Sequence, residues 1–311
     1  MFPIGSVGKI LTKASLKKFG ERLFYTPTKT LRIAWKVLGF FIAVNAFGIC
    51  LDLLLRALNK GKPLFLPFRS GDALVALGAT LLVLRLEGRS LASIGLKLNR
   101  QFFIQLFFGA VAAILMVLLT TSPILLMDGF GFPSGLGLKV LLSGLATALG
   151  ISIFEEGLFR GYAFQKLIEG LGPWKAQAVF ALLFALPHLV GRNIPAPMRF
   201  AVVINAAMVA ILLGAAFLKT RSLAASIGWH WAWNWTLGPL LGFSVSGHVF
   251  PSLLIAKNGE LPSALSGGGF GPEASLTFTL IGLLALLLLA RAPNSPLHPD
   301  QAAHGPKFWE R

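Results

Sequence analysis

Long apolar stretches recur along this sequence and set the first constraint on its fold. A helix needs about 20 mostly apolar residues to cross about 30 Å of hydrocarbon. Eight stretches come near that length, although the second is short and the fourth and fifth extend past their apolar cores. They are 33–55, 73–86, 102–127, 138–159, 174–190, 200–218, 223–241 and 276–292. The pattern predicts an all-α, polytopic membrane protein, a helical bundle with about eight transmembrane helices.

The basic residues support this fold class and suggest an orientation. The chain holds 28 Lys and Arg against 12 acidic residues, a net charge of +16. These basic residues lie beside the apolar stretches, so we expect membrane lipid rather than nucleic acid as a partner. The excess before the first stretch predicts a cytoplasmic N-terminus, and eight crossings return the C-terminus to the cytoplasm. The loop 56–72 disagrees, because this count places its four basic residues outside.

Five segments follow from these stretches. They are a basic cytoplasmic segment 1–32, N-terminal transmembrane helices 33–137, a core 138–241, a connector with the last transmembrane helix 242–292, and a polar tail 293–311. An interfacial helix is expected near 5–24; a mitochondrial transit peptide is the weaker alternative, because the segment is rich in Lys rather than Arg. The single cysteine, Cys50, excludes an intrachain disulfide and is expected to pack as a small apolar side chain.

Two adjacent carboxylates interrupt the fourth stretch. Glu155 and Glu156 follow an almost uncharged run, and ionisable residues at such depth usually mark a functional site. The two point about 100° apart on a helix and therefore cannot do the same job. Glu156 lies four residues before Arg160, the favourable order for an ion pair, so we expect that pair to stabilise the helix.

Two of the five histidines, His188 and His230, also lie in apolar stretches. Glu155 and His188 each lie about 16 residues from the turn at 171–172, which puts both ~25 Å from it on antiparallel helices. We therefore expect Glu155 to face His188. His230 shares a helix face with Asn234, and Phe184 shares one with His188, where the phenyl ring can shield the imidazole.

This group of side chains suggests peptide hydrolysis. A carboxylate beside an imidazole can take a proton from water, and a second imidazole with an amide can donate to an oxyanion. The prediction is an intramembrane endopeptidase that uses Glu155, His188, His230 and Asn234 and forms no covalent intermediate. Ser226 is the nearest candidate nucleophile and is expected to pack within its helix.

Other interpretations of the same residues stay open. Glu155, His188 and His230 form a zinc-type His₂Glu ligand set if a divalent metal is present, although no HExxH motif occurs; no cofactor is certain. A non-catalytic binding, immunity or scaffold protein and a proton-coupled transporter are the rival functions, and no inverted repeat supports the transporter. The tryptophans around His230 are expected to pack in the core or form an aromatic belt rather than stack on substrate. They are Trp229, Trp231, Trp233 and Trp235.

Three short motifs occur in a fixed order: Glu-Glu-x-x-x-Arg at 155–160, Phe-x-x-x-His at 184–188 and His-x-x-x-Asn at 230–234. Together they resemble the CPBP intramembrane proteases, also called the CAAX-processing type II endopeptidase or Abi family. The resemblance covers roughly 140–240. The segment Arg89 to Leu96, with its Ile-Gly-Leu, and Arg160-Gly161-Tyr162 are also similar to that family.

The resemblance implies a bundle of about eight spans with a membrane-embedded site that opens toward the cytoplasm. Glu155 and His188 would activate the water, His230 and Asn234 would stabilise the oxyanion, and Glu156 with Arg160 would support them. The family includes proteins described as metalloproteases and as metal-independent glutamate enzymes. The substrate would be a membrane-associated protein or peptide. We expect an integral protein of the bacterial inner membrane; the oligomeric state is unknown.

Overall fold

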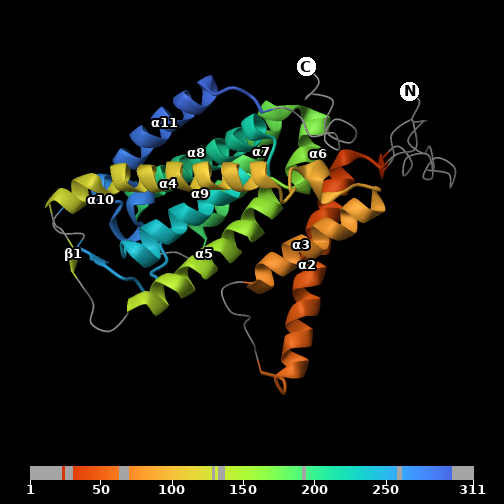
Figure 1. Cartoon of the computed structure of the whole chain (residues 1–311), viewed down its shortest axis with the longest axis horizontal. Coiled ribbons are helices and arrows are strands. Elements are labelled where there is room, and N and C mark those ends of the chain that lie inside the picture. The colour runs from red at the N-terminus through yellow and green to blue at the C-terminus, as the bar shows by residue number, and fades with distance from the viewer. Residues whose placement is uncertain are drawn as a thin grey trace, which may run out of the picture.

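The computed structural model is a bundle of α-helices with a folded connector at one end (Figure 1). It describes residues 23–24, 31–62, 70–127, 130–131, 137–190, 194–257 and 261–295. The helix expected near 5–24 lies almost wholly outside these residues, as does the tail after 295. The predicted all-α membrane-type bundle is confirmed by the long apolar helices.

The chain order of the elements follows the apolar stretches closely. The helices are α2 (Ile33–Leu58), α3 (Ser70–Leu86), η2 (Leu91–Ile94), α4 (Arg100–Met127), α5 (Gly137–Phe159), α6 (Tyr162–Leu171), α7 (Pro173–Ala185), η3 (Leu186–Leu189), α8 (Ala196–Thr220), α9 (Leu223–Trp235), the π-helical η4 (Thr236–Leu240), α10 (Ser263–Ser266), η5 (Gly268–Phe270), η6 (Pro272–Ala274) and α11 (Leu276–Arg291). The two short strands are β1 (Phe130–Gly131) and β2 (Ile255–Ala256). Local signals explain several boundaries: Pro173 opens α7, and Ser222 and Ser275 cap α9 and α11 with their hydroxyls.

The count of eight spans is confirmed only in part. Among the described residues, four apolar helical segments are long enough to cross a membrane: α2, α4, the run Gly137–Leu171 and α8. The other four expected spans correspond to shorter helices; α3 has 17 residues, α7 and α9 have 13 each, and α11 has 16. At 1.5 Å per residue, a 13-residue helix covers only about 20 Å. The apolar stretches of α7 and α9 continue as 3₁₀ and π turns, which hydropathy alone does not distinguish from α-helix.

Helix α9 lies at the centre of the bundle and packs tightly against α4. Two glycines allow this approach: a Cβ on Gly228 would lie 2.1 Å from the Leu106 carbonyl oxygen, and one on Gly109 would lie 2.3 Å from that of Ala225. Small residues at helix contacts are typical of membrane bundles. The close α4–α9 contact fixes the helix that carries His230 and Asn234.

One end of the bundle holds a network of partly buried charges. Glu87, after α3, accepts hydrogen bonds from Lys36 of α2 at 2.7 Å and from the Tyr162 hydroxyl of α6 at 3.0 Å. Lys166 of α6 also pairs with Glu87 at 2.9 Å. Burial raises the pKa of Glu87, but the hydrogen bonds from Lys36 and Lys166 outweigh that effect and lower it to about 2. This network joins the start of α2, the end of α3 and α6.

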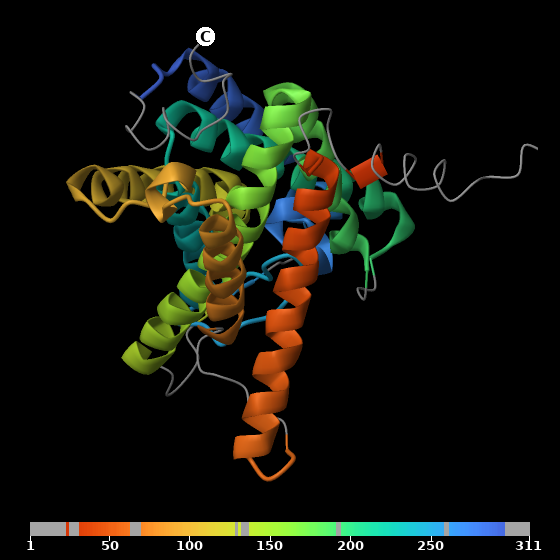
Figure 2. The same cartoon turned by 90° about the vertical axis from the view of Figure 1, so that its right-hand side faces the viewer.

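The opposite end is closed by the connector, residues 242–274. Its β2 pairs antiparallel with β1, which follows α4, so that Phe130 lies opposite Ala256. Figures 1 and 2 show the connector away from the α6 end of the bundle, and they show the second half of α2 extending past the other helices. The exposed leucines of this half of α2, such as Leu53 and Leu58, suit a lipid-facing surface. Cys50 is also exposed there, so it does not fill the core as expected.

Candidate functional site

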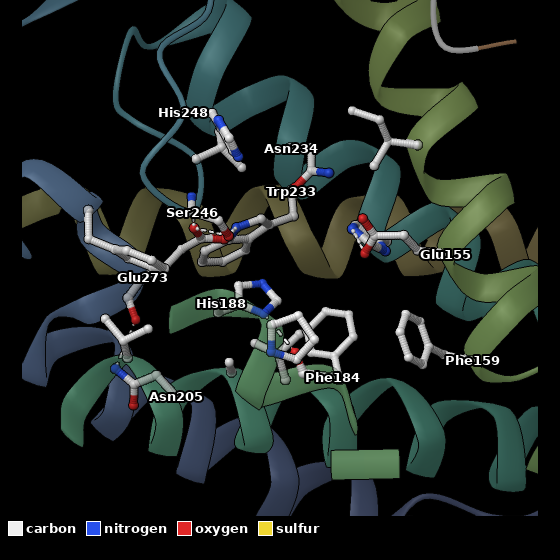
Figure 3. A pocket seen from close by; sticks show the side chains of 18 of the residues that line it. Glu155, Phe159, Phe184, His188, Asn205, Trp233, Asn234, Ser246, His248 and Glu273 are labelled. Carbon is white, nitrogen blue, oxygen red and sulfur yellow. Dashed lines mark hydrogen bonds and ion pairs between the residues drawn. The ribbon is translucent and has the colours of Figure 1, made fainter. Parts of the chain in front are cut away.

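A cavity of about 660 Å³ lies between α5, α7, α8, α9 and the connector. All four candidate catalytic residues line it: Glu155, His188, His230 and Asn234. Figure 3 shows Glu155 entering from the α5 side and His188 from the wall below it. The sequence therefore predicted correctly that these side chains, from three separate apolar stretches, gather in one hollow.

The base of the site is a buried charge cluster. Glu156 Oε1 accepts from Arg160 Nη1 at 3.1 Å and from His230 Nδ1 at 2.9 Å. Arg160 also donates from Nη2 to the Ala210 carbonyl oxygen of α8 at 3.1 Å. The predicted Glu156–Arg160 pair is thus present. The sequence did not reveal its second role, which is to hold His230.

The contact with Glu156 decides which nitrogen of His230 faces the cavity. A carboxylate only accepts hydrogen bonds, so Nδ1 carries the proton that joins His230 to Glu156. The other ring nitrogen, Nε2, lies 3.8 Å from Glu155 Oε2. That gap is too long for a hydrogen bond, but one water can lie about 2.8 Å from both atoms. A proton on Nε2 would bring the summed charge of Glu155, Glu156, Arg160 and His230 to zero.

The imidazole of His188 is also oriented by a hydrogen bond from its Nδ1, in this case within its own helical turn. Its Nδ1 lies 2.7 Å from the Phe184 carbonyl oxygen, which can only accept, so Nε2 is the basic nitrogen. The Phe184 ring packs on the imidazole with 4.9 Å between ring centroids, which confirms the predicted shielding. We expected Glu155 to face His188; both line the cavity, while the measured ion-pair distance joins Glu155 to His230.

The four tryptophans divide into two pairs on opposite sides of α9. Trp229 and Trp233 stack in parallel with centroids 5.0 Å apart, and both line the cavity. Trp231 and Trp235 instead donate from their indole nitrogens to carbonyl oxygens of α5 at 2.9 and 3.0 Å. Core packing, the expected role, is confirmed for Trp229 and Trp233, which belong to a buried hydrophobic cluster, whereas Trp231 and Trp235 are only partly buried. Ser226 also packs as expected, because its buried hydroxyl donates to the Leu213 carbonyl oxygen at 3.0 Å.

The suggested zinc ligands do not form a metal-binding group. Within the part of the chain that the structure describes, no cluster of three or more His, Cys, Asp or Glu side chains is arranged to hold a metal ion. The bond from His230 Nδ1 to Glu156 does not decide the question, because Nε2 faces the cavity and a metal-bound histidine commonly donates its other N–H to a carboxylate. Metal binding by Glu155, His188 and His230 stays an untested prediction.

The connector supplies cavity residues that sequence reasoning missed. Ser246, His248 and Glu273 line the cavity opposite Glu155 (Figure 3). Glu273 accepts hydrogen bonds from the Trp233 indole at 2.8 Å and from Ser246. Burial raises the pKa of Glu273, and these hydrogen bonds oppose that effect. The sequence feature that could have indicated Glu273 is its position as an isolated acidic residue between Pro272 and the last apolar stretch.

The connector side of the cavity lies away from the charge network of Glu87, which is at the α6 end of the bundle (Figure 1). We take the connector side as the cavity mouth, because Val249 of the connector lines the cavity and is 83% exposed. Lys36, at the start of α2, belongs to the far end. A cytoplasmic N-terminus and a site that opens to the cytoplasm were both expected. Both stay predictions; with the mouth on the connector side, they assign different ends of the bundle to the cytoplasm.

The comparison with protein families agrees with the motifs. Residues 137–236 match a family model described as type II CAAX prenyl endopeptidase Rce1-like. This region is therefore similar to the type II CAAX prenyl endopeptidases of the Rce1-like family. The match runs from α5 to the first residue of η4 and includes all four candidate catalytic residues. A comparison with curated proteins finds no match.

The boundaries of the Rce1-like region separate a shared core from the rest of this chain. The core carries Glu155, His188, His230 and Asn234. The connector begins after the match ends, so Ser246 and Glu273 lie outside it. The family match therefore supports the general activity, and the connector must be understood from its own contacts.

Proposed function

We propose that this protein is an intramembrane endopeptidase that hydrolyses a peptide bond of a membrane-associated protein or peptide. The Rce1-like match supports a CAAX-type protease with a protein or peptide substrate. The observation that carries the mechanism is the Glu156–His230 contact of 2.9 Å, which directs Nε2 toward Glu155. In that orientation Nε2–H of His230 can donate to an oxyanion beside Glu155, and water activation by Glu155 needs no serine or cysteine.

Hydrolysis begins with a water held between Glu155 and the basic Nε2 of His188. Glu155 takes one proton as the water oxygen attacks the carbonyl carbon. The oxyanion accepts hydrogen bonds from Nε2–H of His230 and the amide of Asn234. The intermediate then collapses, the C–N bond breaks, and protonated Glu155 gives its proton to the leaving amine. The products are a carboxylic acid and an amine, which account for all atoms of the peptide and the water.

The cavity lining suits an apolar substrate segment. Around the polar groups lie Phe154, Phe159, Phe184, Val209 and Phe278, among others. Exclusion of water strengthens the interactions of the charges and dipoles at the site. Binding of extended apolar chain would therefore both place the scissile bond and dry the site.

The proposal is tested with purified protein in liposomes and two quenched-fluorescence probes. One is a farnesylated peptide that ends in Cys-aliphatic-aliphatic-X; the other is a library of unprenylated apolar peptides. The reaction is run in H₂¹⁸O, and mass spectrometry locates the cut. We expect a new C-terminus that contains one ¹⁸O, and no cleavage by His188→Ala. Persistent lack of cleavage, with proton-coupled uptake by the same liposomes, would support the transporter instead.

The side on which the site opens is a separate proposal. We infer that the cavity mouth faces away from the cytoplasm, because the basic loops lie at the other end of the bundle. In a Cys50→Ser background, Val249→Cys should react with a membrane-impermeant maleimide in intact cells. Lys175→Cys, at the start of α7, should react only after permeabilisation. The reverse labelling pattern would restore the cytoplasmic opening that the family resemblance implies.

A further inference from the structure

Glu273 occupies a position that joins the connector to the core. Its carboxylate accepts one hydrogen bond from Trp233 Nε1 at 2.8 Å, one from the Ser246 hydroxyl at 3.0 Å and one from the Ser246 backbone N–H. Trp233 lies on α9 beside Asn234, whereas Ser246 lies in the connector. One side chain therefore bridges a wall of the cavity and the segment at its mouth.

We propose that Glu273 is a positioning residue that holds the connector over the cavity and so determines how tightly a peptide binds. The proposal rests on the function proposed above. It assigns to Glu273 no contact with the reacting bond; Glu273 acts through Ser246.

The segment that Glu273 holds is a strained turn. Val245 and His248 exchange two backbone hydrogen bonds of 2.9 Å, and the residues between them, Ser246 and Gly247, have φ of 48° and 78°. Positive φ at both central positions defines a type I′ turn, which is costly for a residue with a side chain such as serine. Glu273 binds both the N–H and the hydroxyl of that serine and stabilises its conformation.

The backbone of Glu273 is fixed independently of the turn. Asn205 of α8 donates to the Glu273 carbonyl oxygen at 2.9 Å and to that of Ser275 at 3.1 Å. Asn205 in turn accepts from the Thr279 hydroxyl of α11 at 2.8 Å. Because α8 and α11 hold Glu273 from behind, its carboxylate is a fixed support for the turn. The turn has a further anchor, the hydrogen bond from Gly247 N–H to the Phe270 carbonyl oxygen at 2.8 Å.

This arrangement predicts an effect on binding rather than on chemistry. The turn carries His248 and Val249 to the cavity mouth, and both line the cavity. Glu155 and His230 belong to α5 and α9, which pack against each other without Glu273. Release of the turn should therefore weaken substrate binding while the catalytic groups stay in place.

The first test separates KM from kcat in liposomes, with whichever probe peptide the wild-type protein cleaves. Glu273→Ala and Glu273→Gln should raise KM roughly tenfold, since two hydrogen bonds from Ser246 to a charged group are lost or weakened. Both should leave kcat within about threefold of wild type. Ser246→Ala keeps the backbone contact and should raise KM only about threefold. Ser252→Ala, whose hydroxyl bonds to Leu254 within the same connector, is the control without effect.

The double variant Glu273→Ala/Ser246→Ala tests whether Glu273 influences KM through Ser246. If Glu273 acts through Ser246, adding Ser246→Ala to Glu273→Ala should not raise KM again. An unchanged KM in Glu273→Ala, or a fall in kcat with KM constant, would overturn the proposal.

The second test does not require proteolysis. In the Cys50→Ser background, Val245→Cys places a thiol in the turn at a position that is 6% exposed. N-ethylmaleimide should label it at least about fivefold faster when Glu273→Ala is added, because the turn then opens more often. Equal labelling rates would refute the positioning role even if no probe peptide is ever cleaved. Lack of cleavage alone would count only against the proposed function.

Discussion

Glu156 and His230 lie 74 residues apart in the sequence and meet in a hydrogen bond of 2.9 Å between Oε1 and Nδ1. Arg160 completes the arrangement from one turn further along α5. All three side chains are buried, so the cluster gives His230 one orientation and one tautomer. The Glu156–Arg160 pair, which the sequence predicts to stabilise its helix, thus also orients the candidate catalytic residue His230.

Loss of the Glu156 charge should affect both stability and activity. Glu156→Gln leaves Arg160 buried without its ion pair, which should cost about 3–5 kcal/mol of unfolding free energy in an SDS titration. The kcat should fall at least ~100-fold, because an amide no longer enforces the Nδ1–H tautomer of His230. Adding Arg160→Met should recover stability but not kcat. Recovery of both would mean that Glu156 serves the fold alone.

Asn234 should contribute mainly to the transition state. Removal of one oxyanion donor by Asn234→Ala should lower kcat roughly 10²–10³-fold with little change in KM. Trp235→Phe is the matched control on the next position of α9, where the indole bonds to Leu141 away from the cavity. Steady-state kinetics of the two variants decide this; equal kcat values would remove Asn234 from the oxyanion site.

The network around Glu87 predicts acid sensitivity at the α6 end of the bundle. The pKa of Glu87 is about 2 in the folded protein against 4.5 for an ordinary Glu. Because the folded value is lowered, the stabilisation is complete above pH 4.5 and is lost as the pH falls toward 2. Because Glu87 and Lys36 are partly exposed, solvent screening reduces the stabilisation to on the order of 1–2 kcal/mol. Melting temperatures from pH 6 to pH 3 should fall less steeply for Glu87→Gln than for wild type.

The packing of α4 on α9 should tolerate no side chain at Gly228. A Cβ there would lie 2.1 Å from the Leu106 carbonyl oxygen, so Gly228→Ala must push the helices apart. We expect a loss of roughly 1–3 kcal/mol. Gly39→Ala on α2 is the control, because nothing lies within 4 Å of its added Cβ. Equal stability of both variants, measured by SDS unfolding, would contradict the central place given to this contact.

Relations within one helix could be predicted from the sequence, and relations between distant segments could not. The pairs Glu156–Arg160 and Phe184–His188 follow from a spacing of four residues, and both are present. The Glu156–His230 contact depends on how α9 packs against α5, which no local pattern encodes. Sequence spacing predicted that Glu155 and His188 share a depth; it could not fix the rotation of either helix.

The contacts of the connector could not be predicted for the same reason. Its turn at Ser246 depends on Glu273, 27 residues later, so neither residue is informative alone. Helix lengths were also hard to predict, because the apolar stretches of α7 and α9 continue through 3₁₀ and π turns without a change in hydropathy.

The proposed hydrolysis depends on the carboxylate of Glu155, and its most direct test is the kcat of Glu155→Gln on the first probe peptide that the wild-type protein cleaves. Asp52→Asn, an exposed acid on α2, is the matched control. With both variants folded as judged by SDS unfolding, Glu155→Gln should lose at least ~10³-fold in kcat, since the amide cannot accept the proton of water. A kcat within about tenfold of wild type would contradict water activation by Glu155.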